Sequence, residues 1–389
     1  MRYEEYKDSG VAWIGEIPSH WEVAAFKRRI SINNGRDYKE FQDDEIYPVM
    51  GSGGCFAYCS KYMYDGEALL LGRKGTIDKP LYINGKFWTV DTMFYAIPNK
   101  DLDCKFAYYL AITFPFNLYS TSTALPSMTQ TDLGNNPVAF PPLVEQQAIA
   151  SYLDKKCGKI NGAIDVQKKK IDLLNELKQT IITNAVTKGL NPNAPMKDSG
   201  VEWIGEIPEH WKIKRTRFLC NIQTGDKDTV NREDDGLYPF YVRSPKVERI
   251  NTYSFDGEAV LMAGDGVGAG KVFHYANGKF DYHQRVYNLH NFKDVSGLFF
   301  YYYILNKFRY IIEEGAAKNT VDSVRLNMIQ DFWMTIPPVS EQQNIVKYID
   351  GEISKIDSQI AKANQRIELL NELKQSIITE AVTGKIKVC

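Results

Sequence analysis

The sequence lacks the segments and the charge that would mark a membrane protein or a protein that coats nucleic acid. No apolar run is long enough to span a bilayer, and residues 1–10 have neither the basic start nor the apolar stretch of a signal peptide. We therefore expect a cytoplasmic protein. The 47 lysines and arginines are offset by 48 aspartates and glutamates, which leaves a net charge of −1. Any contact with nucleic acid must come from local patches, or be shared with a basic partner.

Cysteine and histidine are scarce, and their spacing does not resemble that of a metal site. The chain has six cysteines and five histidines, with no CxxC pair. The cysteines are Cys55, Cys59, Cys104, Cys157, Cys220 and Cys389. We expect free, reduced thiols and no metal site in this chain.

The motifs of the relevant enzyme classes are also missing. Methyl transfer to a base amine uses an Asn/Asp-Pro-Pro-aromatic loop, but Asn136-Pro137-Val138 does not match it and no glycine-rich cofactor strand is present. Glu176-Leu177-Lys178 and Glu372-Leu373-Lys374 match only the last part of a nuclease motif, and both lie in helix-like segments where a charged helix face explains them. The few histidines support no Ser-His-Asp arrangement. We therefore expect no catalysis by this chain alone.

What the sequence does have is repetition, first of two long helix-like segments. Residues 145–190 end in LNELKQTIITNAVTKGL and residues 341–386 end in LNELKQSIITEAVTGKI. Both have a heptad seam with polar interruptions, which predicts a coiled coil in which each segment is the partner of the other. The first seam comprises Leu153, Cys157, Ile160, Ile164, Gln167, Ile171, Leu174, Lys178, Ile181 and Ala185, and the second comprises Ile349, Ile353, Ile356, Ile360, Ala363, Ile367, Leu370, Lys374, Ile377 and Ala381.

A second repeat precedes each helix-like segment. KDSGVAWIGEIPSHW at residues 7–21 returns as KDSGVEWIGEIPEHW at residues 197–211. The chain therefore consists of a globular part, a helix, a second globular part and a second helix. Only the short segment GLNPNAP, residues 189–195, joins the first helix to the second globular part. A short linker favours an antiparallel helix pair and a pseudo-two-fold relation between the halves.

The globular parts have mixed secondary-structure signals. We expect strands at Glu67–Leu71 and Glu258–Met262, and helices at Cys104–Thr113 and Ser296–Phe308. The dipeptides Asn84-Gly85 and Asn277-Gly278 predict type I′ hairpin turns. Ser340, with Gln343 three residues later, predicts the N-terminal capping box of the second long helix.

A glycine run in the second globular part, Gly264–Gly270, has Gly72–Gly75 as its counterpart. It follows one predicted strand and leads to another, so a nucleotide-binding fingerprint is disfavoured. Two interpretations stay open. The run is a turn that needs positive φ angles, or a loop that lets the backbone approach DNA, with Arg73 and Lys74 as cations.

Polar and basic residues at corresponding places in the two globular parts are candidate DNA contacts, because Arg and Gln read base edges in the major groove. In the first part they are Arg36, Arg73, Lys74, Thr76, Ser127, Thr129 and Gln130. In the second part they are Arg243, Ser244, Lys246, His283, Gln284, Arg285, Lys318, Asn319, Arg325 and Asn327. A solvated surface role explains any single one. As a set, they differ between the parts while the surrounding scaffold is kept, as expected of two readers of different sequences.

Taken together, these features resemble the specificity subunits of type I restriction–modification systems. The resemblance covers nearly the whole chain and depends on the order of the parts and on several motifs. They are WIGEIPxHW, YPVMGSGG (residues 47–54), GRKGT (72–76), YPFYVRS (238–244), DYHQRVY (281–287), PPLVEQQ and PPVSEQQ. The match is weakest where Val90-Asp91-Thr92 stands opposite His283-Gln284-Arg285.

The resemblance implies an α+β architecture with two target-recognition domains separated by a long antiparallel coiled-coil spacer. It divides the chain into recognition domain 1 (residues 1–142), spacer helix 1 (143–190), linker and recognition domain 2 (191–338) and spacer helix 2 (339–389). Each domain would read one half of a bipartite DNA target. The subunit would itself be non-catalytic. Two modification subunits would methylate adenine with S-adenosylmethionine, and restriction subunits would cleave DNA with ATP and Mg²⁺.

Apolar residues beside the seam are candidate docking points for the modification subunits: Leu173, Leu177, Ile182, Leu369, Leu373 and Ile378. Packing against the adjacent globular part is the alternative. Two other functions stay open for the chain as a whole. One is a coiled-coil assembly adaptor whose globular parts bind protein, and the other is a self-contained restriction enzyme, which the missing motifs oppose.

Overall fold

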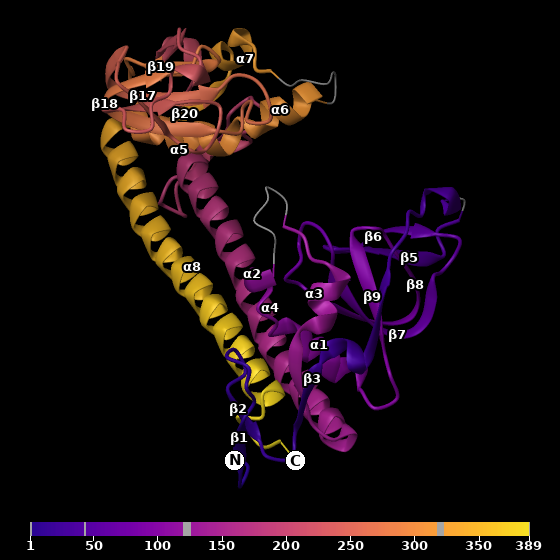
Figure 1. The fold of residues 1–389 in the computed structure, drawn as a ribbon. Helices are drawn as coiled ribbons and strands as arrows, with labels where there is room; N and C mark the ends of the chain where they lie inside the picture. Colours follow the sequence, from indigo (N-terminus) through magenta and orange to yellow (C-terminus); the bar gives the residue numbers. More distant parts are fainter. Residues whose placement is uncertain (1, 43, 120–125, 317–322, 389) are drawn as a thin grey trace. The chain divides into compact units, whose positions relative to one another are not determined.

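Two long helices, α4 (Leu143–Lys188) and α8 (Val339–Val382), dominate the computed structural model of the chain (Figure 1). The structure describes residues 2–42, 44–119, 126–316 and 323–388. The chain divides into two compact units. Unit 1 is Met1–Lys168 with Asn364–Cys389, and unit 2 is Lys169–Ala363. Each unit therefore combines a globular part, the start of the helix that follows it and the end of the other helix.

The two units contain the same elements in the same order. Unit 1 has β1 (Tyr6–Asp8), β2 (Glu16–Pro18), β3 (Glu22–Ala25), β4 (Ile30–Asn34), β5 (Tyr47–Gly51), β6 (Gly54–Cys59), β7 (Tyr64–Gly72), β8 (Leu81–Thr89), β9 (Met93–Pro98), α1 (Cys104–Ile112), α2 (Phe116–Tyr119), α3 (Gln130–Asn135) and β10 (Pro137–Phe140). Unit 2 has β11 (Met196–Asp198), β12 (Glu206–Pro208), β13 (Lys212–Arg215), β14 (Asn221–Thr224), β15 (Tyr238–Tyr241), β16 (Glu248–Ile250), β17 (Phe255–Ala263), β18 (Phe273–Tyr282), β19 (Val286–His290), α5 (Gly297–Lys307), α6 (Arg309–Ala316), α7 (Leu326–Gln330) and β20 (Trp333–Ile336). The predicted strands and helices of the globular parts are confirmed.

Each unit is built on a mixed six-stranded sheet. The strand order is β4-β9-β7-β8-β5-β6 in unit 1 and β14-β19-β17-β18-β15-β16 in unit 2, which is the same topology. One parallel pair interrupts an otherwise antiparallel sheet, β5 with β8 and β15 with β18. Helix α1 packs on β7 to β9 and α5 packs on β17 and β18. The expected α+β class and the internal repeat are both confirmed.

The helices pair in antiparallel fashion within each unit. In unit 1, Lys374 Nζ donates to Asn161 Oδ1 at 2.9 Å. In unit 2, Lys178 Nζ donates to Asp357 Oδ1 at 2.8 Å. Both pairs of residue numbers add to 535 (161 + 374 and 178 + 357), and a constant sum is the mark of an antiparallel register. The two lysines that interrupt the predicted seam thus make cross-helix hydrogen bonds while their stems stay half-buried.

The predicted seam coincides with the covered faces of α4 and α8. Every one of its twenty residues is buried or half-buried, whereas most of the residues between them are exposed. At the ends of the helices the seam joins the core of a unit. Leu153 and Ala381 lie in the unit 1 core, and Ala185 and Ile349 lie in the unit 2 core.

The repeated WIGEIPxHW motif anchors each globular part to the helices. Trp21 is fully buried, and its indole N–H donates to Glu145 Oε1, 3.2 Å away, in the first turn of α4. The corresponding Trp211 donates to Glu341 Oε1 in α8 at 3.1 Å. In unit 1 the strands β1 and β2 also lie beside the end of α8 (Figure 1), where Lys385 Nζ donates to the Glu16 carbonyl at 2.6 Å. The motif therefore contacts the start of one helix and the end of the other.

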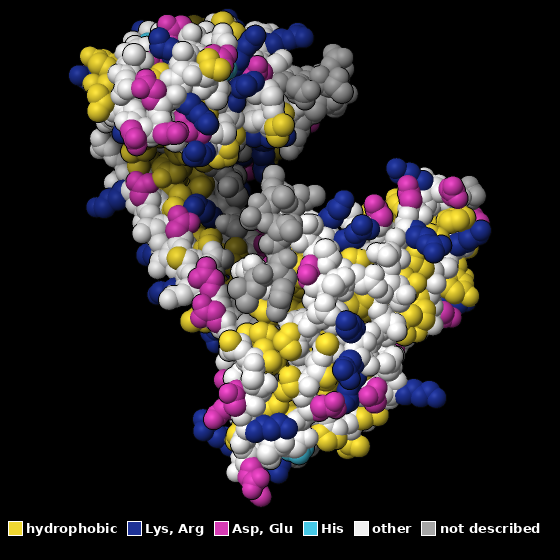
Figure 2. All heavy atoms as spheres, in the orientation of Figure 1, with side chains coloured by type: hydrophobic (Ala, Val, Ile, Leu, Met, Phe, Trp, Pro, Cys, Tyr) yellow, Lys and Arg dark blue, Asp and Glu magenta, His cyan; other side chains and the backbone are white. Residues whose placement is uncertain are grey.

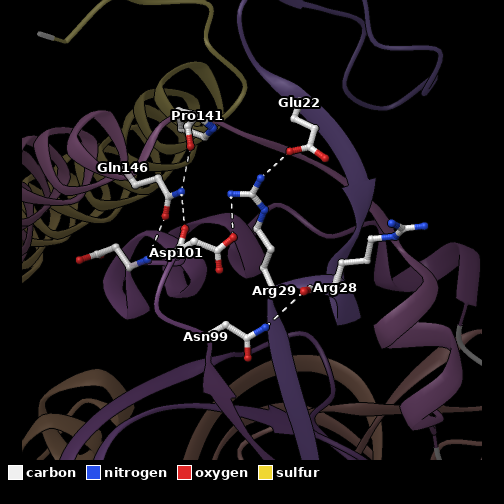
Figure 3. Close-up of polar contacts among 8 residues, drawn as sticks. Glu22, Arg28, Arg29, Asn99, Asp101, Pro141 and Gln146 are labelled. Atoms are coloured by element: carbon white, nitrogen blue, oxygen red, sulfur yellow. Dashed lines mark hydrogen bonds and ion pairs between the residues drawn. The ribbon is translucent and has the colours of Figure 1, made fainter.

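The first glutamine in the EQQ part of each helix start connects three segments, and Figure 3 shows the first of the two, Gln146. Gln146 Nε2 donates to the carbonyls of Pro141 at 2.9 Å and Asp101 at 3.1 Å, and Gln146 Oε1 accepts from the Asp103 N–H at 2.9 Å. Its counterpart, Gln342, bonds to Pro337, Asp294 and Ser296 in the same way. These fully buried side chains link the strand before the long helix to the N-terminus of α1 or α5.

The hairpin prediction for the two Asn-Gly pairs is wrong. Gly85 lies inside β8, opposite Gly66 of β7, with φ angles of 114° and 142°. Gly278 and Gly257 repeat this arrangement with φ angles of 111° and 146°. The glycine of each Asn-Gly pair does have a positive φ angle, as a type I′ turn requires. Here the angle produces a local distortion within two paired strands, and the chain does not turn.

The predicted capping box at Ser340 is also wrong. Helix α8 begins at Val339, directly after Pro337-Pro338, so Ser340 lies within the first turn. Because neither proline has an N–H to satisfy, a helix start after this pair needs fewer capping groups. The N–H groups of Glu341 and Gln342 donate to the Pro338 carbonyl instead.

Candidate nucleic-acid interface

In unit 2, polar residues gather at one edge of the six-stranded sheet. The segments that follow β14, β15, β17 and β18 meet there, and the last of them leads into β19. The backbone joins the adjoining loops there. The Gly264 N–H donates to the Arg285 carbonyl at 2.8 Å, and the His283 N–H donates to the Tyr241 carbonyl at 2.9 Å. Arg243, Gln284 and Arg285, three of the predicted DNA contacts, are therefore brought together from segments far apart in the sequence.

Carboxylates hold these predicted contacts in place. Arg243 Nη1 lies 3.0 Å from Asp265 Oδ1, and Arg285 Nε lies 3.6 Å from Asp265 Oδ2. Gln284 Nε2 donates to Asp228 Oδ2 at 2.8 Å. The guanidinium and amide groups remain largely exposed, so they are oriented without being withdrawn from solvent.

His283 lies beneath this cluster with only 2% of its surface exposed. Its Nδ1 accepts the Arg285 backbone N–H at 2.9 Å. Burial, and then the nearby charge of Arg243, lowers the pKa of His283 from its ordinary value of 6.5. Burial acts to raise the pKa of the Asp228 carboxyl, but the hydrogen bond from Gln284, the backbone hydrogen bonds at Thr229 and Val230 and the proximity of His283 together lower it. At neutral pH the edge therefore has a neutral histidine beneath the arginine–carboxylate pairs.

Two cavities open on this edge. One, of about 400 Å³, is lined by Arg243, Ser244 and Asp265 among others. The second, of about 370 Å³, is lined by Gln284, Arg285, Arg325 and again Asp265. Both offer hydrogen-bond donors and acceptors, the groups that contact the edges of bases.

The same edge of unit 1 contains a different set of side chains. Arg36 follows β4, and its N–H donates to the Thr89 carbonyl at 2.9 Å. Arg73 and Lys74 follow β7, where Lys74 forms an isolated bridge with Ser127. Thr76 lies in the same loop and is half-buried. These five predicted contacts therefore share one edge.

Of the remaining predicted contacts, Arg325 lines the second cavity of the unit 2 edge, and the others have local roles or lie elsewhere. Thr129 caps α3 by accepting the Asp132 N–H, and Gln130 Nε2 donates to the Ile32 carbonyl. Arg325 precedes α7, which contains Asn327, and both are exposed. Lys246 pairs with Glu248 at 3.2 Å. Lys318 and Asn319 lie outside the described residues. None of these placements tests a role in DNA binding.

The six apolar docking candidates separate into two kinds. Ile182 and Ile378 are buried in the cores of units 2 and 1, so they belong to the packing that was the alternative explanation. The leucines stay exposed: Leu173 at 64%, Leu177 at 48%, Leu369 at 58% and Leu373 at 49%. Each unit thus presents one exposed leucine pair.

Sequence reasoning missed the two carboxylates, Asp228 and Asp265. Asp265 lies within the glycine run, which has positive φ angles at Gly266 and Gly270, as the first of the two open interpretations requires. The only signal was a carboxylate within a run of glycines. Its significance depends on Arg243 and Arg285, which are distant in the sequence.

The surface charge agrees with the near-zero net charge. Figure 2 shows basic and acidic side chains interspersed on the face drawn. Among the described residues, no cluster of three or more histidine, cysteine or carboxylate side chains is arranged to hold a metal ion. None of the described helices combines the length and apolarity needed to cross a bilayer.

The chain belongs to the type I restriction–modification DNA specificity domain family. The family model matches residues 18–181 and again residues 208–371, so it covers both units and most of the chain. The two matched ranges correspond to the two repeats recognised in the sequence. Each range contains one six-stranded sheet and most of one long helix. A role in recognising DNA sequence accompanies this family.

Individual relatives agree with this assignment. The chain is 30% identical to the EcoDI specificity subunit of Escherichia coli over 47% of this chain and 40% of that protein. It is 26% identical to the putative MjaX specificity subunit of Methanocaldococcus jannaschii over 67% of this chain and 62% of that protein. The chain thus spans less than two thirds of the length of these relatives.

A solved structure shows the same fold. It comes from work on complex assembly and conformational transition of the type I restriction–modification system. The match has a TM-score of 0.71 at 15% identity, and it covers 95% of this chain and 99% of that one.

Proposed function

We propose that this chain is a non-catalytic specificity subunit whose two units each read one half of a bipartite DNA target. The observation that carries the proposal is the contrast between a repeated scaffold and a variable edge. The strand order, the buried tryptophan and the helix contacts recur in both units. The edge does not recur, because His283-Gln284-Arg285 stands where unit 1 has Val90-Asp91-Thr92. Conservation of the fold with replacement of its base-reading groups is what two different half-sites require.

The chemistry that acts on DNA would then come from partners. Modification subunits would bind S-adenosylmethionine and methylate adenine. Restriction subunits would use ATP and Mg²⁺ to cleave. Two modification subunits are proposed because each unit presents the same exposed leucine pair, Leu173 with Leu177 and Leu369 with Leu373, within the repeated LNELKQ sequence. Two equal surfaces suit two copies of one partner.

Methylation mapping tests the DNA-reading function. The chain is expressed with its modification subunit in cells that otherwise leave the target unmethylated, and modified adenines are mapped across the genome. We expect one bipartite motif, which disappears when the chain is omitted. Methylation that persists without the chain, or that follows no motif, would refute the proposal.

The docking surface is tested by co-purification. The double substitution Leu177→Glu and Leu373→Glu should abolish recovery of the modification subunit, because it places charge at the centre of each proposed contact. Val166→Glu is the matched control, since Val166 is 62% exposed on α4 but lies outside both leucine pairs. Unchanged recovery with the double variant would exclude these leucines as the docking site.

A further inference from the structure

Asp265 occupies a central place at the unit 2 edge. It lies just after β17, forms an isolated bridge with Ser323 and lines both cavities. One carboxylate oxygen faces Arg243 at 3.0 Å and the other faces Arg285 at 3.6 Å. The Asp265 side chain is 26% exposed. A carboxylate can accept about four hydrogen bonds, so two arginine contacts leave acceptor capacity for a third group that approaches from solvent.

Backbone contacts identify the counterpart of this cluster in unit 1. The Arg73 N–H donates to the Thr92 carbonyl as the Gly264 N–H donates to the Arg285 carbonyl, both at 2.8 Å. The bridge of Lys74 with Ser127 matches the bridge of Asp265 with Ser323. Lys74 therefore occupies the place of Asp265, and Thr92 the place of Arg285.

The parallel strand pairs identify the third residue of the unit 1 cluster, the counterpart of Arg243. Met50 is paired with Thr89 as Tyr241 is paired with Tyr282, so Ser52, two residues after Met50, corresponds to Arg243, two residues after Tyr241. The cluster of Arg243, Asp265 and Arg285 thus replaces Ser52, Lys74 and Thr92.

The two clusters have equal charge but different hydrogen-bonding patterns. Each has a formal charge of +1, from two arginines and one aspartate in unit 2 and from one lysine in unit 1. General attraction to phosphates therefore does not distinguish them. What differs is that unit 2 presents a carboxylate acceptor between two donors. Beside DNA an isolated carboxylate would be repelled, and the flanking arginines remove that penalty.

We propose that Asp265 is a specificity-determining residue of unit 2 that accepts a hydrogen bond from the exocyclic amine of a cytosine in the half-site read by that unit. The inference rests on the proposed DNA-reading function. Of the base groups in the major groove, the cytosine amine is the one that a carboxylate reads without meeting an adjacent acceptor on the same base. Asp265 repels the acceptor atoms of guanine and thymine at the same position.

A binding experiment separates base reading from a structural role. The complex of the chain with its modification subunit is titrated with duplexes that contain the mapped target. In a second set, each cytosine of the unit 2 half-site is replaced in turn by pyrimidin-2-one, which lacks the amine. For one position we expect the wild-type complex to lose affinity by between about 5-fold and about 150-fold. The Asp265→Ala complex should lose less than about 2-fold at that position, because the interaction is already absent.

Two variants complete the design. Asp265→Asn keeps the shape but adds a donor, so its preference at that position should move from cytosine towards adenine. Asp256→Asn removes an exposed carboxylate on β17 outside the cluster and should behave as wild type. Equal sensitivity of wild type and Asp265→Ala at every cytosine, or a unit 2 half-site without cytosine, overturns the inference while the proposed function stands. A wild-type complex that selects no sequence overturns both.

Discussion

Units 1 and 2 share a scaffold down to individual hydrogen bonds, yet they differ at the edge of their sheets. Trp21 with Glu145 and Trp211 with Glu341 make the same contact at 3.2 and 3.1 Å. At the edge, by contrast, Lys74 stands where unit 2 has Asp265. The difference shows that the contacts between a unit and the long helices are the same in both copies. The exposed side chains at the edge of the sheet differ between the copies. A change made in one unit, with the other unit as its control, shows how far the two are equivalent.

The largest effect should follow from removing the anchoring tryptophan. Trp21→Ala should destabilise unit 1, and Trp211→Ala unit 2, by about 3–5 kcal/mol each, because loss of a fully buried indole leaves a cavity and removes one hydrogen bond to the glutamate. Amide hydrogen exchange resolved by peptide measures this. If each change reduces hydrogen-exchange protection by a similar amount, and only in the mutated unit, the two scaffolds are equivalent. Loss of protection in both units from either change would show that they unfold together.

A smaller effect is expected for the reader of one half-site. Arg285→Ala should weaken discrimination in the unit 2 half-site by about 1–3 kcal/mol and leave the other half-site unchanged. Methylation mapping measures it, with Thr92→Ala at the corresponding place in unit 1 as the control. A change in both half-sites would contradict independent reading by the two units.

Acid should affect unit 2 more than unit 1. Burial lowers the pKa values of His274, His283 and His290, all in unit 2, from the ordinary value of 6.5. A lowered pKa means that the unfolded chain binds protons more readily, so stability is complete above about pH 6.5 and is lost as pH falls below it. Hydrogen exchange at pH 7.5 and pH 5.5, corrected for intrinsic rates, should show selective loss of protection in unit 2. Equal loss in both units would refute this account.

The smallest effect concerns an ion pair found in unit 1. Lys105 Nζ lies 2.5 Å from Asp154 Oδ2, with 41% of each side chain exposed. The hydrophobic Leu298 follows the N-cap of α5 by two residues, as Lys105 follows the N-cap of α1. Lys105→Leu should therefore cost less than about 1 kcal/mol in thermal unfolding, because exposed pairs are weak. A larger loss would show that the pair is important to the docking of α1 on α4.

Much of the architecture could be predicted from the sequence because it depends on periodicity. The heptad positions, including Lys178 and Lys374, coincide with the covered helix faces, since period 3.5 translates directly into one side of a helix. Local dipeptide signals were less reliable. Asn84-Gly85 required a positive φ angle, but only its pairing with Gly66 shows that the angle lies within a strand.

The sequence by itself determined the repeat, the antiparallel helices and the family, because order and spacing along the chain are sufficient for all three. Only the tertiary structure decided which polar residues act together. Asp265 lies 22 residues after Arg243 and 20 before Arg285, and no pattern links them. The parallel pairing of β15 with β18 and the short turn before β19 bring them to one edge. Contacts between distant segments depend on strand order, which a list of residues does not contain.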